Sequence, residues 1–423
     1  MTAEIICVGT ELLLGNIINT NGAYLANQCA KYGIACYYQD VVGDNEERLL
    51  GLLKTATQRA DVILLSGGLG PTEDDMTKES VAKFLGKELV LDQESLERIE
   101  EYFKTRKLVM TENNKKQALI PEGAVALPND NGTAPGIYLE TEGATYVLLP
   151  GPPQELIPMV ESQVMPRLLA KSDQAICSQT VKICGIGESK AETMIKDLID
   201  AQTNPTIATY AKVGEVHIRV TAKAEDEKEA LKLIKPVIKE LKNRFGNAIY
   251  TTDESITLEK AVADLLLANH LTISCAESCT GGKLSARLIG VPGISEAYKV
   301  GYVTYSNKSK RKLLDVKKSI LQKYGAVSEN VAKEMVKGLM RETETDVTLA
   351  TTGIAGPDGG TPEKPVGLVY IACNVKGKIV VKECHFKGDR EKIRDNAVAA
   401  ALELARLCLL EYFSEVTFGK EKK

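Results

Sequence analysis

The chain contains 423 residues, and a prior of about 150 residues per domain indicates two or three domains. Its hydrophobic content of 44% and charged content of 26% are ordinary for a globular protein. The net charge of -4 excludes a general electrostatic attraction to nucleic acid or anionic membranes. No stretch approaches the ~20 apolar residues that span a bilayer, and the first residues lack the basic leader of a signal peptide. We therefore expect a cytoplasmic protein.

The first part of the chain, residues 1–172, alternates strand-like and helix-like segments. Apolar runs typical of buried strands cover 4–9, 34–43, 61–70 and 146–153. Segments with helical spacing of their apolar residues cover 21–33, 45–60, 81–89 and 95–106. This alternation predicts an α/β domain whose mostly parallel sheet is covered on both faces.

The central part, residues 173–252, changes in character and predicts a small α+β module. Its order is strand, helix, strand, strand, helix, over 178–187, 189–201, 205–212, 215–223 and 226–246. This split βαβ order is KH-like. Its GIGE turn carries no basic residue, so we do not expect direct contact with nucleic acid.

The last part, residues 253–423, again predicts an α/β domain. Helical patterns cover 255–270, 280–290, 328–343 and 390–413. Strand patterns cover 271–278, 296–306, 346–356, 367–375 and 378–386, the last two forming a hairpin. No internal repeat relates the three parts of the chain.

Cysteine and histidine usage narrows the possible chemistry. The ten cysteines are scattered, several within apolar runs, which is typical of free buried thiols in a reducing compartment. Cys275 and Cys279 lack the further ligands that a zinc site needs. Because only His217, His270 and His385 are available, a Ser-His-Asp triad has few candidates. Catalysis should instead depend on serine, lysine, tyrosine, carboxylates or a metal.

Four polar segments containing glycine or lysine interrupt the last part, each beside a strand or helix end: 276–282, 303–310, 351–360 and 386–394. Ligands of open α/β sheets bind at the carboxyl ends of the strands, so these segments could form one site. Ser278 and Thr280 lie between a strand and a helix. Gly281 and Gly282 permit close backbone approach, and the helix start would offer free N–H groups to an anion.

A serine nucleophile at this position needs a base other than histidine. Lys310, with help from Tyr305, could serve if its pKa falls from ~10.4 to ~7 through burial. Thr352 and the backbone of Gly353 could hold the developing oxyanion. Arg390 and Arg394 are four residues apart on the last helix, so both could face a phosphate.

Simpler interpretations of two of these residues remain open at this point. Ser278 could cap the following helix. Lys310 lies in the charged run NKSKRK, and such runs are usually solvated. Spacing alone does not bring Ser278 and Lys310 together.

Five of these segments resemble the bacterial nicotinamide-nucleotide amidases: ISCAESCTGGKLSARL, GYVTYSNKSK, YGAVSENVA, TTGIAGPDGGTPEKPVG and GDR. These enzymes convert nicotinamide mononucleotide to nicotinic acid mononucleotide and ammonia without a cofactor. The resemblance covers residues 257–413 and implies Ser278 as nucleophile, Lys310 as base and Tyr305 as its partner. It also implies Thr352 near the oxyanion. Arg390 or Arg394 would lie near the substrate phosphate.

The first part contains a glycine loop, SGGLGPTEDDMT, between a strand and a helix. Its backbone could cradle a phosphate, and its acidic run suits a hard cation. The ligand-binding candidates here are Gly9, Thr10, Glu11, Gly67, Gly68, Gly70 and Thr72. The metal-ligating candidates are Asp44, Glu73, Asp74 and Asp75. Together they indicate a metal-assisted phosphate or pyrophosphate site, unless the acidic run merely caps the next helix.

The first part also resembles the molybdopterin-binding domain family, and the whole chain resembles the competence/damage-inducible CinA family. The segments that carry this resemblance are GTELLLGNIINTN, SGGLGPTEDD, NNKKQALIPEGAVALPNDNGTAPG and LLPGPPQEL. It implies a homodimer and hydrolysis of ADP-ribose with a divalent metal of unknown identity. Two alternatives remain: the first part only binds a pterin or nucleotide, or the protein is a non-enzymatic partner in DNA uptake or repair.

Overall fold

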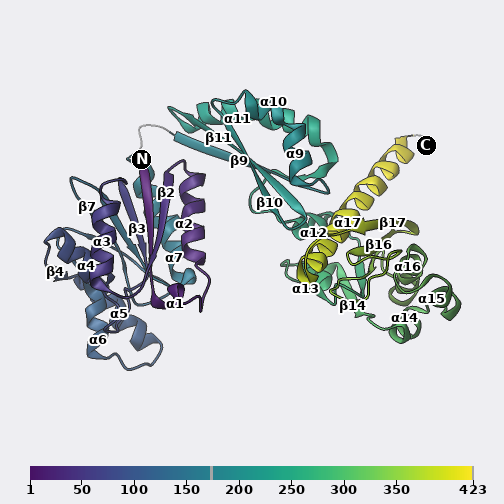
Figure 1. The fold of residues 1–423 in the computed structure, drawn as a ribbon, viewed down its shortest axis with the longest axis horizontal. Helices are drawn as coiled ribbons and strands as arrows, with labels where there is room; N and C mark the ends of the chain where they lie inside the picture. The colour runs from purple at the N-terminus through teal and green to yellow at the C-terminus, as the bar shows by residue number, and fades with distance from the viewer. Residues whose placement is uncertain (172–174, 422–423) are drawn as a thin grey trace. The chain divides into compact units, whose positions relative to one another are not determined.

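The computed structural model describes residues 1–171 and 175–421, with side chains described as far as residue 415. The expected domain boundary between residues 172 and 173 lies outside the described residues. The chain forms two compact units, which consist of Met1–Ser178 with Thr221–Lys232, and Gln179–Val220 with Leu233–Lys423. Strands and helices of both units follow the mixed α/β pattern that the sequence predicts (Figure 1).

The N-terminal sheet has six strands in the order β2-β1-β3-β8-β7-β6. Their bounds are β1 (Thr2–Val8), β2 (Ala35–Val42), β3 (Val62–Ser66), β6 (Val125–Leu127), β7 (Gly136–Glu140) and β8 (Thr145–Leu149). The first four strands of this order are parallel, whereas β7 and β6 are antiparallel to their neighbours. The prediction of a mostly parallel sheet is confirmed, and it brings the carboxyl ends of four strands to one edge.

Helices cover both faces of this sheet, because every second residue of its buried strands points to the opposite face. Leu25 of α2 and Leu156 of α7 pack on one face, and Leu49 of α3 and Val81 of α4 pack on the other (Figure 1). The remaining elements lie around this core. The helices are α1 (Thr10–Leu13), α2 (Thr20–Lys31), α3 (Glu46–Ala56), α4 (Thr77–Leu85), α5 (Gln93–Thr105), α6 (Glu112–Lys115), α7 (Pro153–Met159) and α8 (Met165–Leu169), and a short ribbon pairs β4 (Leu89–Leu91) with β5 (Leu119–Pro121).

The C-terminal sheet has five strands in the order β14-β13-β15-β16-β17. Their bounds are β13 (Ile273–Glu277), β14 (Tyr298–Val303), β15 (Val347–Gly353), β16 (Leu368–Val375) and β17 (Lys378–His385). β13 is parallel to both of its neighbours, and the last two strands form the predicted antiparallel hairpin. Its two-residue turn takes the left-handed conformation at Lys376 and Gly377, with φ of 50° and 94°.

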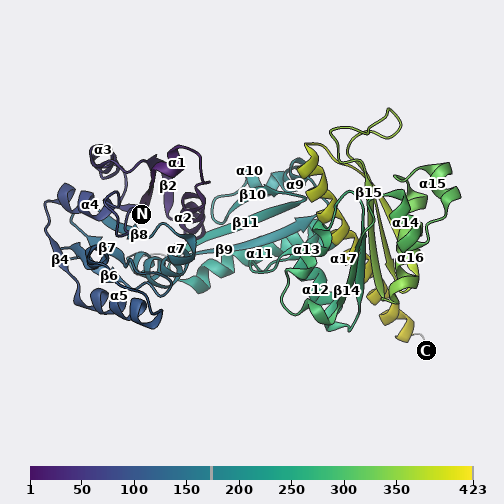
Figure 2. The ribbon, with the colours of Figure 1, turned by 90° about the horizontal axis from the view of Figure 1, so that it is seen from below.

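This sheet is also covered on both faces (Figure 2). One hydrophobic cluster joins it to α12, α13 and α17, and a second joins it to α14, α15 and α16. The helices are α12 (Leu258–Ala268), α13 (Lys283–Ile289), α14 (Asn307–Leu314), α15 (Lys318–Tyr324), α16 (Glu329–Thr343) and α17 (Arg390–Glu421). Within the described part of the chain, no helix is both long and apolar enough to cross a membrane.

The central module forms a four-stranded sheet in the order β10-β11-β9-β12. Its elements are β9 (Ala175–Cys184), β10 (Thr206–Lys212), β11 (Glu215–Ala224), β12 (Ile249–Thr251), α9 (Glu188–Met194), α10 (Lys196–Asp200) and α11 (Glu227–Phe245). The single helix predicted over 189–201 is wrong, because Ile195 leaves the helical conformation. Arg244 donates a hydrogen bond of 2.9 Å to the carbonyl of Met194 and so replaces a helical partner of that carbonyl.

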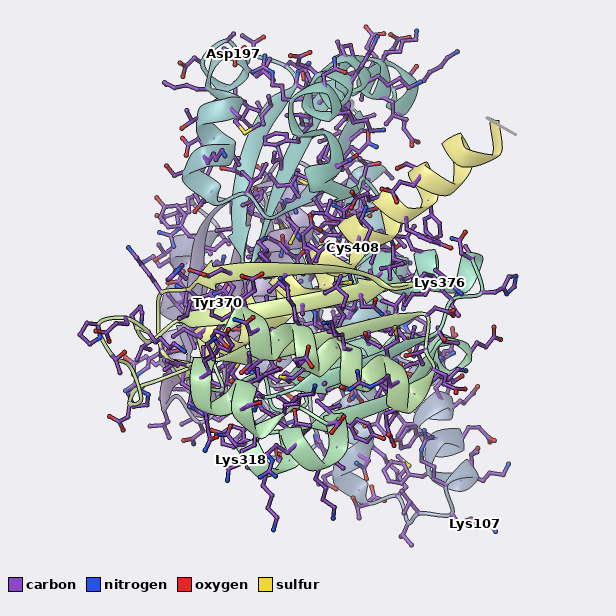
Figure 3. The ribbon with its side chains drawn as sticks, turned by 90° about the vertical axis from the view of Figure 1, so that its right-hand side faces the viewer. Lys107, Asp197, Lys318, Tyr370, Lys376 and Cys408 are labelled. Atoms are coloured by element: carbon purple, nitrogen blue, oxygen red, sulfur yellow. The ribbon has the colours of Figure 1, made fainter. Side chains whose placement is uncertain are left out.

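All ten cysteines are free, and eight of them are buried. Cys408, labelled on α17 in Figure 3, belongs to the same core cluster as Cys373 of β16. These positions agree with the expectation of unpaired core thiols rather than a disulfide framework. Among the residues that the structure describes, no group of three or more histidine, cysteine or acidic side chains is placed to hold a metal.

Candidate functional site

Ser278 lies at the carboxyl end of β13, the strand between the two parallel neighbours β14 and β15. Its backbone N–H donates to the carbonyl of Thr351 at 3.0 Å, which extends the sheet by one residue. Ser278 is 8% exposed. The parallel order of these strands brings the polar segments that follow them to the same edge, as predicted.

Lys310 reaches Ser278 from α14. The Nζ atom of Lys310 is 2.9 Å from the Oγ of Ser278 and 2.7 Å from the carbonyl oxygen of Thr304, and it also reaches the carbonyl of Tyr305 at 3.3 Å. Lys310 is 1% exposed, so the interpretation of this residue as part of a solvated charged run is wrong. None of the three acceptors carries a negative charge.

Burial lowers the pKa of Lys310 from 10.5 to about 8. The cause is desolvation of the ammonium, which no carboxylate near Nζ offsets among the contacts of the described residues. A lysine with such a pKa is partly neutral near pH 7 to 8 and can accept a proton from the hydroxyl that it touches. Ser278 and Lys310 are therefore in direct contact, in an arrangement that could activate the hydroxyl without histidine.

Glu277, rather than an external anion, occupies the start of α13. Its buried carboxylate accepts hydrogen bonds from the N–H groups of Gly282, Leu284 and Ser285, and from the Ser285 hydroxyl, at 2.6 to 3.1 Å. The expectation of free N–H groups at this helix start is wrong, because an internal carboxylate already binds them. The N-cap is Gly282, so Ser278 does not cap the helix.

The two arginines of α17 have different partners. Arg394 donates to the carbonyls of Cys279 and Thr280 at 3.1 and 3.0 Å and to Glu391 at 2.6 Å. Arg390 is exposed and donates to the carbonyl of Gly356 at 2.7 Å and to the Tyr305 hydroxyl at 3.4 Å. Arg390 thus uses two guanidinium nitrogens and is exposed, whereas all three guanidinium nitrogens of Arg394 donate to protein acceptors.

The remaining residues predicted for this site lie on or beside β15. The Thr280 hydroxyl is 2.7 Å from that of Thr351, which fixes the loop after Ser278 to the strand. The Thr352 hydroxyl donates to the carbonyl of Ala326 at 2.8 Å, and Gly353 pairs with Val369 of β16. The hydroxyl of Thr352 is thus already committed to a protein acceptor.

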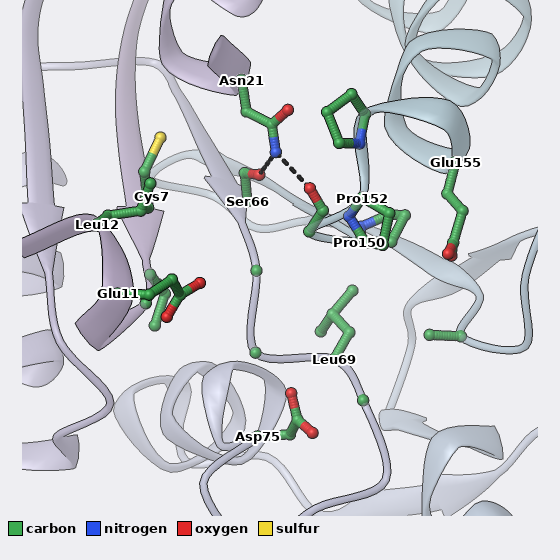
Figure 4. A pocket seen from close by; sticks show the side chains of 18 of the residues that line it. Cys7, Glu11, Leu12, Asn21, Ser66, Leu69, Asp75, Pro150, Pro152 and Glu155 are labelled. Atoms are coloured by element: carbon green, nitrogen blue, oxygen red, sulfur yellow. Dashed lines mark hydrogen bonds between the residues drawn. The ribbon is translucent and has the colours of Figure 1, made fainter. Parts of the chain in front are cut away.

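A second candidate site is a cavity of about 740 Å³ in the N-terminal unit. It lies at the carboxyl ends of the parallel strands, where the sequence places the glycine loop. Asn21 connects two of its walls by donating to the Ser66 hydroxyl at 2.8 Å and to the carbonyl of Gly151 at 2.6 Å (Figure 4). Of the predicted ligand-binding residues, those that line the cavity are Gly9, Glu11, Gly67, Gly68 and Gly70.

The glycine loop needs glycine for steric reasons. Gly67 and Gly68 have φ of 103° and 67°, which L side chains rarely adopt. A Cβ atom at Gly67 would lie 2.2 Å from the carbonyl oxygen of Val8. At Gly68 it would lie 2.2 Å from the hydroxyl oxygen of Thr77. The bare backbone of this loop is therefore a wall of the cavity.

The cavity is acidic. The carboxylates that line it are Glu11, Asp44, Asp74, Asp75 and Glu155, and among its described lining residues none is lysine, arginine or histidine. Figure 4 shows Glu11, Asp75 and Glu155 around the opening. Glu73, the fourth predicted metal ligand, is exposed and lies outside this lining.

Two of these carboxylates are held by the backbone. Asp44 accepts from the N–H of Thr10 at 2.9 Å, and Asp75 accepts from the N–H and the hydroxyl of Thr72 at 2.9 and 2.5 Å. The acidic run does not cap α4, whose N-cap is Met76 without a side-chain hydrogen bond. Each carboxylate retains oxygens for a hard cation, although the protein alone supplies no cluster of three such ligands among the described residues.

Two lysines behind this loop were not singled out from the sequence. Lys116 Nζ donates to the carbonyls of Thr72 and Asp75 at 3.1 and 2.7 Å, and the buried Lys78 donates to the carbonyl of Lys116. Burial lowers the pKa of Lys78 to about 8. Lys116 thus supports the acidic loop through its backbone carbonyls, and Lys78 supports Lys116. The partners are 38 to 44 positions apart in the sequence, so no local motif predicts these contacts.

Family models match three consecutive parts of the chain. Residues 4–170 match the "Probable molybdopterin binding domain", residues 178–251 the "Damage-inducible protein CinA KH domain", and residues 255–409 the "CinA C-terminal domain". Ser278, Lys310 and Arg394 fall within the last match, and the acidic cavity falls within the first.

Whole-chain relatives agree with these matches. A protein of Clostridium beijerinckii is 54% identical over 97% of this chain and 100% of its own length. A "CinA-like protein" of Dictyoglomus thermophilum is 52% identical over 97% and 100%, respectively. The crystal structure of the competence/damage inducible protein CihA from Agrobacterium tumefaciens is 37% identical, with a TM-score of 0.35 over 36% of this chain and 93% of that one.

Proposed function

This chain belongs to the CinA family, and from that premise we propose that its C-terminal domain is a serine amidase that hydrolyses the carboxamide of nicotinamide mononucleotide. The observation that carries the proposal is the 2.9 Å contact between Lys310 Nζ and Ser278 Oγ, made by a buried lysine with a lowered pKa. Such a pair suits attack on an amide carbonyl, which needs an activated hydroxyl and a proton for the leaving amine.

Acylation follows from this geometry. Neutral Lys310 accepts the hydroxyl proton as Ser278 Oγ bonds to the carboxamide carbon. The carbon–nitrogen bond then breaks, and the ammonium of Lys310 returns the proton to the leaving nitrogen, so that ammonia departs. In the second step Lys310 accepts a proton from water, the hydroxide attacks the ester carbon, and the proton returns to Ser278. The products are ammonia and the carboxylic acid, which ionises to the carboxylate by releasing its proton to solvent.

Arg390 supports a nucleotide monophosphate as the substrate. Its guanidinium is exposed near Tyr305, and that tyrosine is 63% exposed beside the Lys310 segment. An exposed arginine with unused donors suits a terminal phosphate. Arg394 is less suited to this role, because each of its three guanidinium nitrogens already donates to a protein acceptor.

The first test is release of ammonia from nicotinamide mononucleotide by the purified full chain and by Ser278→Ala. We expect release by the wild type and at least a thousandfold loss in the variant. Ser274→Ala is the matched control, because Ser274 lies on the same strand with a buried hydroxyl that has no hydrogen-bond partner among the described residues. Release that survives Ser278→Ala would reject the serine mechanism, and no release by folded wild type would reject the amidase.

A second activity is favoured by the acidic cavity of the N-terminal unit. Five carboxylates, with no basic residue among the described lining residues, would repel a pyrophosphate, so an anionic ligand would need a cation to enter with it. We propose metal-dependent hydrolysis of ADP-ribose at this cavity. Asp44 and Asp75 would hold a divalent cation, which supplies neutralisation of the pyrophosphate and Lewis acidity when bound.

This second proposal is tested by AMP release from ADP-ribose with Mg²⁺, Mn²⁺ or Co²⁺. Asp75→Asn should abolish release, because it removes a charge from the cavity wall. Glu73→Gln is the matched control on the same loop, since Glu73 is exposed outside the lining. If ADP-ribose binds but is not hydrolysed with any of these metals, the N-terminal unit would be a nucleotide-binding domain without this activity. Binding of a pterin in preference to ADP-ribose would replace the proposed ligand.

A further inference from the structure

The wall of the acidic cavity contains a buried carboxamide. Gln117 lies on the short 3₁₀ helix Lys116–Ala118, lines the cavity and is 3% exposed. Among the described residues, Ser66 and Gln117 are the buried polar side chains in this lining. Ser66 already accepts a hydrogen bond from Asn21 at 2.8 Å. The orientation of the Gln117 amide therefore decides which further polar atom the cavity receives.

A chain of hydrogen bonds fixes that orientation. The backbone N–H of Thr111 can only donate, and Asn114 Oδ1 accepts from it at 3.0 Å. Asn114 therefore turns its Nδ2 toward Gln117 and donates to Gln117 Oε1 at 3.5 Å. This network assigns the oxygen of Gln117 to Asn114 and leaves Nε2 as the atom without a protein partner.

The Nε2 atom of Gln117 is open to the cavity. Within the part of the chain that the structure describes, it donates no hydrogen bond, so none of the cavity carboxylates accepts from it. Nor is this nitrogen sealed in the core, unlike the partnerless hydroxyl of Ser80 on α4. Because Gln117 lines the cavity, we expect the acceptor of its N–H groups to be an atom of a ligand.

The segment that carries Gln117 is tied to the acidic loop of the cavity. The preceding residue, Lys116, donates from Nζ to the carbonyls of Thr72 and Asp75 at 3.1 and 2.7 Å. The buried Lys78 in turn donates to the carbonyl of Lys116. These contacts hold the carboxamide in place beside the loop before any ligand binds, which lowers the entropic cost of using it.

The chemistry of the cavity favours a phosphate oxygen as the acceptor. Sugar hydroxyls can donate to the five carboxylates that line the cavity, so they do not depend on an N–H donor. Phosphate oxygens can only accept, and the carboxylates offer them nothing except through a cation. An amide N–H can serve them without adding a positive charge that would compete with that cation.

We infer that Gln117 is a substrate-binding residue of this cavity, and that its Nε2 donates to a phosphate oxygen of the metal-bound pyrophosphate. The inference rests on the proposed metal-dependent hydrolysis and deepens it by naming a donor that recognises the phosphate. Asp44 and Asp75 would bind the cation, and Gln117 would bind the anion that the cation brings.

Two substitutions separate this role from a structural one. Gln117→Glu keeps an oxygen that can accept from Asn114 but replaces the N–H donor by a negative charge, whereas Gln117→Met removes both functions. A phosphate donor predicts that Gln117→Glu binds phosphate more weakly than Gln117→Met. A structural role predicts the reverse order, with Gln117→Glu close to the wild type and Gln117→Met less stable in urea.

The measurement is calorimetric binding of methylenediphosphonate with Mg²⁺ to the full chain at pH 8, where the added carboxylate is ionised. This probe has no sugar hydroxyls and is not hydrolysed. Its affinity should fall about tenfold in Gln117→Met and about 100-fold in Gln117→Glu, because a hydrogen bond to a charged group is lost. Mg²⁺ alone should bind Gln117→Met within about twofold of the wild type. Gln93→Glu, which adds the same charge at an exposed position outside the lining, is the matched control.

The KM for ADP-ribose in AMP release should rise in the same order as the affinity for the probe falls. A wild type that binds the probe with this order among the variants, yet releases no AMP, would reject the hydrolysis and retain the phosphate donor. Equal binding of the probe by wild type and Gln117→Glu would overturn the inference. It would also be overturned by variants that weaken ADP-ribose alone, or by a wild type that binds Mg²⁺ but not the probe.

Discussion

Lys310 is a buried cation whose partners are a hydroxyl and two carbonyls, and its protonation state should control the proposed amidase reaction. Only the neutral amine can accept the proton of Ser278. With a pKa of about 8, about one tenth of the lysine is neutral at pH 7. We therefore expect kcat/KM for nicotinamide mononucleotide to rise about tenfold per pH unit below pH 8 and to level off above it.

This profile is measured by initial rates of ammonia release between pH 6 and 9.5, with circular dichroism to show that the protein stays folded. The Lys308→Met variant is a suitable control, because Lys308 is exposed on the same helix. A profile that falls as the pH rises through 8 would contradict a neutral lysine base.

The same burial predicts a conflict between activity and stability at Lys310. Its pKa falls from 10.5 to about 8 on folding, which opposes folding by about 3 kcal/mol when the lysine is charged at pH 7. Lys310→Met keeps the apolar stem but loses the hydrogen bond to Thr304. We expect no activity and a free energy of unfolding about 1–2 kcal/mol higher at pH 7.

The sign of the pH effect can be tested in urea unfolding at pH 7 and 9.5. Because the folded pKa of Lys310 is the lower one, the unfolded chain binds more protons between pH 8 and 10.5. Wild-type stability from this group therefore rises with pH, and the advantage of Lys310→Met should shrink by pH 9.5. If the stability advantage of Lys310→Met over the wild type instead grows with pH, burial does not destabilise the charged form of Lys310.

At the residue scale, the sequence identifies the reactive types but not their contacts. The scarcity of histidine and the glycine motif after β13 point to Ser278 and Lys310. Their meeting depends on the parallel order of β13 and β14 and on the burial of Lys310, which the charged run around it conceals. Arg390 and Arg394 lie four residues apart on one helix, so the sequence pattern does not tell them apart. Only the contacts of Arg394 with the loop carbonyls distinguish the two residues.

At the scale of elements, Glu277 connects β13 to α13 and fixes the loop that begins with Ser278. Glu277→Ala would leave three N–H groups and one hydroxyl without their acceptor. Each such buried group costs about 1–3 kcal/mol, so we expect the free energy of unfolding to fall by at least about 3 kcal/mol. Glu277→Gln, which keeps one acceptor oxygen, should lose less.

Urea unfolding of the full chain measures this difference, with Glu296→Ala as an exposed control expected to change stability by less than about 0.5 kcal/mol. If α13 requires an internal carboxylate at its start, phosphate added at ~10 mM should not restore the stability of the Glu277→Gln variant. Equal stability of Glu277→Ala and wild type would mean that α13 does not depend on this cap.

The order of the long helices and strands along the chain was easier to predict than the residues at which they end. The short strands were also harder to predict. Long periodic segments such as α3 and α16 were recognisable because one stripe of apolar residues faces a sheet. Short strands such as β6 and β12, with three residues each, carry too little alternation to be read from the chain. The break between α9 and α10 depends on Arg244, about 50 residues later, so no local pattern shows it.

At the scale of the whole molecule, the two candidate sites belong to different compact units. Ser278 and Lys310 lie in the unit that contains the C-terminal sheet, and the acidic cavity lies in the N-terminal unit. Each site is built from residues of its own unit, with no described hydrogen bond of one site supplied by the other. A change at one site should therefore leave the chemistry of the other unaltered.

Single and double variants test this independence. Ser278→Ala should abolish ammonia release and change metal-dependent AMP release by less than about twofold, and Asp75→Asn should do the reverse. Binding of Mn²⁺ alone, measured by calorimetry, gives a second readout for the cavity that does not depend on turnover of ADP-ribose. Additive effects are expected because separate sites that share no partners combine within about 0.5 kcal/mol. A folded Asp75→Asn protein that loses ammonia release would show instead that the two units exchange free energy, and the cavity would then be a regulatory site for the amidase.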